Sequence, residues 1–145
     1  MQNYREFRVW QQGIELTKTV YRMTGSFPPA ERFGLTAQMR RAAVSVPSNI
    51  AEGYARSGTA EYLRFLSIAA GSVAELETQV ILSCELGFLV KDHQDELLAQ
   101  LDLIGKMLKG LRRSLEPYRL KEDSEWPVDL TAAESSGNCK PEGIS

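Results

Sequence analysis

Four stretches of the chain carry apolar residues at alternating spacings of three and four, the spacing that keeps side chains on one face of an α-helix. They predict helices over residues 6–24, 35–54, 60–86 and 94–118. The predicted buried lines are Phe7, Trp10, Ile14, Thr17, Tyr21 and Thr24; Leu35, Met39, Ala42, Val46, Asn49 and Gly53; Tyr62, Leu66, Ala69, Val73, Leu76 and Val80; and Leu97, Leu101, Ile104, Leu108, Leu111, Leu115 and Tyr118. Because the connections are short, the sequence predicts an all-α, antiparallel up-down-up-down four-helix bundle over residues 1–121.

The ends of these helices carry residue types that cap or stop a helix. Thr59 and Asp92 are the predicted N-caps of the third and fourth helices, and Gly87 is the predicted C-terminal cap of the third. Pro117 is expected to help end the fourth helix. The apolar content falls after residue 121, so residues 122–145 are predicted to form an acidic, disordered tail.

The third predicted helix is apolar around more of its circumference than one buried line explains. Phe65, Ile68, Ile81 and Leu82 lie outside that line. A stripe this wide indicates either the most central helix of the bundle or a helix that also meets another subunit.

The second predicted helix contains a proline, Pro47, in its middle. A proline in a helix interior leaves a carbonyl without its N–H partner and costs about 3 kcal/mol. We expect Ser45, Ser48 and Asn49 to bond the freed or neighbouring backbone groups and the helix to bend at the proline. In this interpretation the cluster is structural.

A second interpretation of the same helix is functional. Arg41, Ser45, Ser48 and Glu52 follow one another at helical spacing, and Arg41 is too far from Glu52 for a direct ion pair along the helix. These polar side chains would then reach a partner subunit. The candidate structural or oligomer-forming residues are Arg41, Ser45, Pro47, Asn49 and Glu52.

The charge is unevenly distributed along the chain. Residues 122–145 hold six acidic groups and one lysine, a net charge of −5, whereas residues 1–121 hold 16 basic and 13 acidic groups, a net charge of +3. In an antiparallel bundle one pole would collect most of the cations. The candidate nucleic-acid-binding residues at this pole are Arg5, Arg8, Arg56, Arg64, Lys109, Arg112 and Arg113.

Two explanations fit this charge pattern. Residues 75–102 hold seven acidic groups and one lysine, so acids gather near the start of the fourth helix and cations near its end, where each complements the helix dipole. Alternatively, the basic pole binds an anion such as a phosphate backbone. In that case the acidic tail is expected to fold back and compete with the nucleic acid.

Residue patterns of enzymes are missing from the sequence. The chain has one histidine, His93, no Cys-x-x-Cys pair, no His-Glu-x-x-His motif and no phosphate-binding lysine loop. The sequence therefore predicts a non-enzyme without a metal or cofactor. With no signal peptide and no apolar run of membrane-spanning length, a cytoplasmic protein without membrane association is expected.

Several motifs together resemble one family. They are the run 38–53 around Pro47, Phe27-Pro28-Pro29, Glu31, Phe33-Gly34-Leu35 and the run 71–77. Over roughly residues 7–118 they resemble the 23S rRNA intervening-sequence proteins, bacterial four-helix bundles. That family is similar to the accessory variability determinant of diversity-generating retroelements, a basic bundle that forms a ring and binds nucleic acid and reverse transcriptase.

The resemblance implies a ring-shaped homo-oligomer, a pentamer, that contacts RNA or DNA. This chain differs from the accessory protein in being less basic and in having an acidic tail. The leading prediction is a non-enzymatic, oligomeric bundle that binds nucleic-acid phosphates at its arginine-rich pole. The alternative is a protein-interaction scaffold or adaptor that binds protein partners and no nucleic acid.

Overall fold

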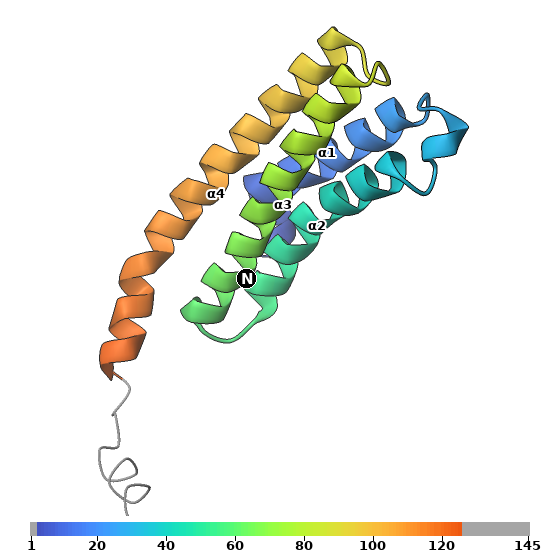
Figure 1. Cartoon of the computed structure of the whole chain (residues 1–145). Helices are drawn as coiled ribbons and strands as arrows, with labels where there is room; N and C mark the ends of the chain where they lie inside the picture. Colours follow the sequence, from blue (N-terminus) through green and yellow to red (C-terminus); the bar gives the residue numbers. More distant parts are fainter. Residues whose placement is uncertain (1–2, 126–145) are drawn as a thin grey trace, which may run out of the picture.

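Four α-helices make up most of the protein. The computed structural model describes residues 3–125 and contains α1 (Arg8–Thr24), α2 (Leu35–Ala55), α3 (Thr59–Glu85) and α4 (Lys91–Glu125), with short 3-10 helices η1 (Tyr4–Glu6) and η2 (Pro29–Glu31). Each helix packs on the next in the sequence, and α1 also packs on α4, so the four helices close into a bundle (Figure 1). Residues 3–125 contain no strand. The predicted all-α four-helix bundle is confirmed.

Contacts between α2 and α3 fix how these helices lie against each other. The hydroxyls of Ser45 and Ser72 are 2.7 Å apart, and Ser83 Oγ lies 3.2 Å from Met39 Sδ. Moving back along α2 from 45 to 39 therefore corresponds to moving forward along α3 from 72 to 83. The two helices run in opposite directions, joined by a link of three residues.

The core matches the predicted lines of α2, α3 and α4 over most of their length. The predicted residues that are buried are Leu35, Met39, Ala42, Val46 and Gly53; Leu66, Ala69, Val73, Leu76 and Val80; and Leu97, Leu101, Ile104 and Leu108. Asn49, Tyr62, Leu111 and Leu115 are half-buried. Although α3 is long and apolar enough to cross a membrane, its apolar line faces this core. Over residues 3–125 the molecule is a bundle built around a buried core.

The predicted buried line of α1 is mostly wrong. The residues that α1 buries include Val9, Gly13, Leu16, Val20 and Met23. Of the predicted line only Thr24 is buried, whereas Phe7, Trp10, Ile14 and Thr17 are half-buried and Tyr21 is exposed. The sequence of α1 carries two stripes at helical spacing, and the one richer in aromatic residues lies beside the core stripe.

Helix ends follow the sequence less closely than helix interiors. Helix α3 begins at Thr59 after Gly58, which has a positive φ of 105°, so Thr59 is the first helical residue and not the N-cap. Helix α4 begins at Lys91, which places Asp92 inside the first turn. Gly87 has a φ of 81°, and its N–H donates to Cys84 O. The predicted glycine cap of α3 is therefore confirmed, while the two predicted N-caps are wrong.

Helix α4 is longer than predicted. It continues through Pro117 to Glu125 and extends past the ends of the other helices (Figure 1). The prediction that Pro117 ends the helix is wrong, and the first four residues of the predicted tail are helical. Residues 126–145 of that tail lie outside the described residues.

Candidate functional site

The proline of α2 is accommodated by α1. Pro47 leaves Ala43 O without its helical donor, and Thr17 Oγ1 lies 3.2 Å from this oxygen and 2.8 Å from Gly13 O. A Cβ added to Gly13 would lie 3.2 Å from the Pro47 ring. The one hydroxyl proton of Thr17 is shared between Gly13 O and the freed carbonyl, which is thus served from a neighbouring helix, and glycine gives the ring its space. The predicted bend of α2 stays a prediction.

The polar residues around Pro47 join α2 to α3 instead of replacing the lost bond. Asn49 Nδ2 donates to Ser45 O at 2.7 Å and to Ser45 Oγ at 2.9 Å. Ser45 Oγ lies 2.7 Å from Ser72 Oγ, which also donates to Ile68 O at 3.2 Å. Asn49 therefore bonds a neighbouring backbone carbonyl, Ser45 O, as expected, whereas the carbonyl freed by Pro47 is contacted by Thr17.

The two charged candidates on α2 have different surroundings. Glu52 accepts from Arg56 on its own helix at 2.9 Å, and both side chains are about half exposed. Arg41 is exposed and forms no ion pair with any described residue. Of the polar face predicted for α2, Arg41 is thus the member whose charge is unneutralised.

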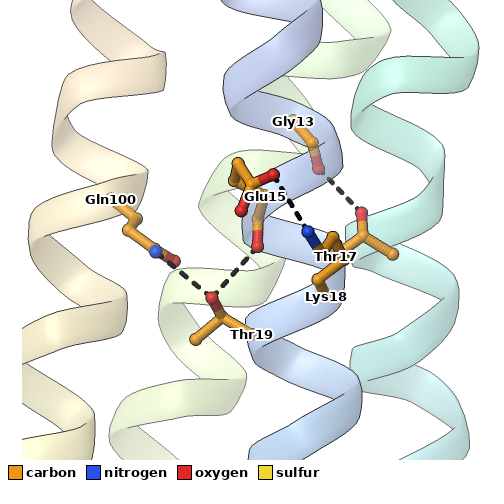
Figure 2. A network of polar contacts seen from close by, with 6 residues as sticks. All are labelled: Gly13, Glu15, Thr17, Lys18, Thr19 and Gln100. Atoms are coloured by element: carbon orange, nitrogen blue, oxygen red, sulfur yellow. Dashed lines mark hydrogen bonds and ion pairs between the residues drawn. The ribbon is translucent and has the colours of Figure 1, made fainter.

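A polar contact ties α1 to α4 in the middle of the bundle. Gln100 Nε2 donates to Thr19 Oγ1 at 3.2 Å, and Thr19 Oγ1 donates to Glu15 O at 3.0 Å (Figure 2). Gln100 Oε1 is buried and has no hydrogen-bond partner. Since a buried polar group without its partner is costly, this contact orients the two helices at a cost in stability.

Four of the seven predicted pole cations belong to α1 and α4 and line two separate depressions. Arg8 lines an apolar groove with Phe7, Val9, Met107 and Leu111. Lys109, Arg112 and Arg113 line a shallow depression on α4 with Glu116, which shares no residue with that groove. None of these four cations forms an ion pair with a described residue. We call Arg8, Lys109, Arg112 and Arg113 the α1/α4 cation cluster.

Two more predicted cations meet over one aromatic ring between α2 and α3. The guanidinium carbons of Arg56 and Arg64 lie 5.0 and 5.6 Å from the centre of the Phe65 ring. Arg56 pairs with Glu52 and Arg64 with Glu61, so both charges are partly neutralised. A Cβ on Gly53 would lie 2.7 Å from Phe65 Cβ, which explains the glycine at this crossing.

The seventh predicted cation, Arg5, lies over the Tyr4 ring at 5.8 Å. Tyr4 in turn packs on Trp10 at a centroid distance of 5.5 Å. The seven cations thus occupy three settings instead of forming one patch. Close to these, Tyr62 has a buried hydroxyl without a partner, and burial raises its pKa.

The end of α4 is attached to the start of α3. Glu122 accepts hydrogen bonds from Thr59 N at 3.0 Å and from Thr59 Oγ1 at 2.7 Å. These bonds to the charged form lower the pKa of the Glu122 carboxyl. Asp123 lies 3.5 Å from Arg119. One acid of the predicted tail, Glu122, therefore contacts the first turn of α3, while Asp123 pairs within α4.

Acidic side chains at the opposite end are only partly paired. Asp95 pairs with Lys91 at 2.9 Å and Glu96 with Arg22 at 3.7 Å. Glu75 and Glu85 form no ion pair with a described residue. Within residues 3–125 no three His, Cys, Asp or Glu side chains are arranged to hold a metal ion.

A surface that the sequence analysis did not single out runs along the junction of α1 and α2. Two adjoining grooves of 540 and 310 Å³ share Val44 as a lining residue. We call them together the α1/α2 groove. Its apolar lining includes Trp10, Ile14, Tyr21 and Phe33, which belong to the misplaced stripe of α1 and to the corner before α2.

Phe33 stands out in this groove because its exposed fraction is 87%. The corner that presents it is closely fixed: Glu31 Oε2 accepts from Leu35 N at 3.0 Å. A Cβ on Gly34 would lie 2.7 Å from the same oxygen, so a side chain there would displace the carboxylate. This geometry explains Glu31 and Gly34 of the predicted family motif. The Arg32 guanidinium lies 5.4 Å from the centre of the Phe33 ring, which stays largely exposed.

A solved structure shares the fold of this chain, and a family profile matches most of its sequence. A crystal structure from Bacteroides thetaiotaomicron VPI-5482, described as a protein with unknown function from the S23 ribosomal protein family, superposes with a TM-score of 0.65. It is 19% identical, and the match covers 72% of this chain and 97% of the other. No curated protein matches the chain. Residues 5–110 match the profile of the 23S rRNA-intervening sequence proteins, and the chain belongs to this family.

Proposed function

We propose that this protein is a non-enzymatic, self-associating bundle of the cytoplasm that binds RNA or DNA phosphates. The observation that carries the proposal is the α1/α4 cation cluster, whose four members lack acidic partners among the described residues. Guanidinium groups bind phosphate oxygens through two parallel hydrogen bonds. The depression on α4, with two such groups and a lysine, fits a phosphate backbone better than a neutral ligand.

The proposal includes self-association because an oligomer would present several copies of a weak phosphate-binding site to one nucleic acid. One cluster of four cations gives only a modest phosphate affinity, whereas a ring of copies presents several clusters to one polymer. The pentameric ring expected from the family resemblance would do so. Arg56 and Arg64, held over Phe65, are the secondary contacts that we expect a longer nucleic acid to reach.

The decisive experiment is a titration of labelled structured RNA and duplex DNA with the purified full-length protein at several salt concentrations. Neutralising four phosphates predicts a fall in affinity of roughly 100-fold between 50 and 200 mM salt. The double reversal Arg112→Glu with Arg113→Glu should abolish binding. No binding to either polymer at the low salt concentration would overturn the nucleic-acid proposal.

A matched control separates a local site from net charge. Lys18 and Lys91 are exposed cations outside the cluster. Lys18→Glu with Lys91→Glu makes the same change in net charge as the test variant. If the control loses as much affinity as the test variant, the overall charge drives binding and the α1/α4 cation cluster is not the site.

The acidic C-terminus offers a second test of the same site. Glu122 must be kept because it bonds to Thr59, so the useful truncation removes residues 126–145 only. That segment holds Asp129, Glu134 and Glu142 against Lys140. If it competes with nucleic acid, its removal tightens binding, and an unchanged affinity contradicts the competition.

A protein-interaction scaffold is the second candidate function. The observation that favours it is the α1/α2 groove with its uncovered Phe33, since large exposed apolar surfaces mark protein contacts. A stable oligomer that binds neither polymer would support this candidate. A protein partner would then be sought with the assembled oligomer.

A further inference from the structure

We propose that the α1/α2 groove of one copy receives the outer edge of α3 from a second copy, head to tail. The inference rests on the self-association in the proposed function and specifies the surfaces that carry it. The edge of α3 consists of Ile68, Gly71, Glu75, Leu82 and Leu86, which follow one another on one exposed side of the helix. The same contact repeated between copies builds a ring or a filament.

The groove and the edge are both apolar surfaces that the subunit leaves uncovered. In the groove, Phe33 is 87% and Val44 40% exposed, and on the edge Ile68 is 40% and Leu86 54% exposed. A single exposed apolar residue needs no explanation, but rows of them along a groove and along a helix mark an interface.

Charge makes the two surfaces complementary to each other and not to themselves. Arg32, Arg40 and Arg41 line the groove, and no carboxylate does. The edge of α3 carries Glu75, whose charge has no cationic partner among the described residues. Groove against groove would bring arginines together, whereas groove against edge pairs opposite charges, and this favours a head-to-tail contact.

Gly71 leaves a gap on the surface of the α3 edge, and no contact within the described part of the subunit requires a glycine there. A Cβ at this position would find nothing within 4 Å, so the glycine relieves no crowding. Glycine in an exposed helix interior costs about 1 kcal/mol relative to alanine. A close approach by another chain explains a glycine here, as Gly53 and Gly13 allow close approaches inside the bundle.

The heights of the two surfaces along the bundle also agree. The Ser45–Ser72 and Met39–Ser83 contacts place Arg41 between the heights of residues 72 and 83 on α3, a span that includes Glu75. Phe33 precedes Met39 and so lies toward Leu86. When two copies pack with parallel axes, Phe33 of one therefore lies at the height of Leu86 of the other. Arg41 of the first copy then lies near the height of Glu75 of the second.

At the other end of the groove the same alignment holds. The contact between Gly13 and Pro47 places this part of α1 at the height of α2 beyond Ser45. Residue 53 of α2 meets Phe65 of α3. Ile14, next to Gly13, therefore lies at a height between residues 65 and 72, where the neighbouring copy offers Ile68 and the gap at Gly71.

Complementation between two defective variants tests the contact. Phe33→Glu disables the groove and Leu82→Glu disables the edge, and both side chains are exposed, so the fold is retained, as circular dichroism would verify. We expect the wild type to form particles of three or more copies in native mass spectrometry and each variant to be monomeric. Their equimolar mixture should give a one-to-one dimer through the one intact groove and the one intact edge.

Leu103→Glu is the matched control, because Leu103 is 37% exposed on α4, outside both surfaces, and should leave the wild-type particle unchanged. Reversing Arg41→Glu should weaken association at least 10-fold, and adding Glu75→Arg should restore it. Variants that stay oligomeric, a mixture that stays monomeric, or a wild-type dimer would each overturn the contact while self-association still stood. A monomeric wild type would overturn both the groove–edge contact and self-association, and the groove would then be a site for another protein. The nucleic-acid titration tests the α1/α4 cation cluster independently.

Discussion

Within residues 3–125 two prolines lie inside α-helices, Pro47 in the middle of α2 and Pro117 near the end of α4. Each removes one helical hydrogen bond and leaves a carbonyl without a donor. Pro47 is buried, and its freed carbonyl receives Thr17 from α1. Pro117 is exposed on α4, between the half-buried Leu115 and Glu122, which bonds to Thr59 of α3. The same local defect thus requires a tertiary partner in the core and only water at the surface.

The largest effect is expected from crowding the buried proline. Gly13→Val would place methyl groups against the Pro47 ring, where even a Cβ would be only 3.2 Å away. Overpacking at a rigid contact should lower the free energy of unfolding by about 3 kcal/mol, measured by urea denaturation. The exposed Gly110→Ala, which meets nothing within 4 Å, should raise it by up to about 1 kcal/mol. If both changes altered the free energy of unfolding equally, the contact between Gly13 and the Pro47 ring would be no tighter than the exposed position at Gly110.

A smaller loss is expected from removing the donor that serves Ala43 O. Thr17→Val should cost about 1–2 kcal/mol because it leaves a buried carbonyl unsatisfied. Thr78→Val should cost under about 0.5 kcal/mol, because the Thr78 hydroxyl is exposed and donates to Ala74 O within the same helix.

A double-mutant cycle sharpens this test. In Pro47→Ala the restored N–H can satisfy Ala43 O, so Thr17→Val should cost clearly less in that background. If the cost of Thr17→Val is the same in both backgrounds, Thr17 does not compensate for the proline.

A local effect is expected at the exposed proline. Pro117→Ala restores one helical hydrogen bond in α4, so amide exchange over residues 114–121 should slow. The global free energy of unfolding should change by less than about 0.5 kcal/mol, because this segment lies beyond most of the core. A large global stabilisation would show that the end of α4 unfolds together with the bundle.

The smallest effect concerns the carboxylate that holds the end of α4. The pKa of Glu122 is lowered in the folded protein by its bonds from Thr59. The stability that the Glu122 carboxylate contributes is therefore fully present above the ordinary glutamate pKa. It is lost as the pH falls through the lowered pKa of Glu122 in the folded protein. The Thr59 amide should be protected from exchange at neutral pH and lose that protection in acid. Glu122→Gln should exchange faster at neutral pH and show little further change on acidification.

The sequence anticipated the core of three helices because each has one dominant apolar line. In α2, α3 and the first half of α4, most of the predicted residues are buried, and Gly87 ends α3 as expected. For α1 the periodicity selected the wrong stripe, since two stripes of similar spacing lie side by side. Only the neighbouring helices decide that Leu16 and Val20 face inward while Trp10 and Ile14 line a groove.

The candidate site was predicted in composition but not in arrangement. Arg112, Arg113 and Lys109 lie together because they follow one another on α4, which the sequence alone could show. Arg8 lines a separate groove with Met107 and Leu111, which exists only because α1 packs on α4. Arg5 was expected at the same pole, but its contact with Tyr4 depends on the 3-10 turn before α1, which has no strong sequence signal.

What the sequence by itself determined is local: where helices form, how long their apolar lines are, and that Pro47 breaks a hydrogen bond. These follow from spacing and from the chemistry of single residues. The tertiary structure decided which α1 stripe is buried, that Thr17 and Gly13 accommodate the proline, and that Phe33 is left uncovered. The physical reason is that a donor or a cavity belongs to whichever chain segment is nearest in space, and distance along the sequence does not specify that neighbour.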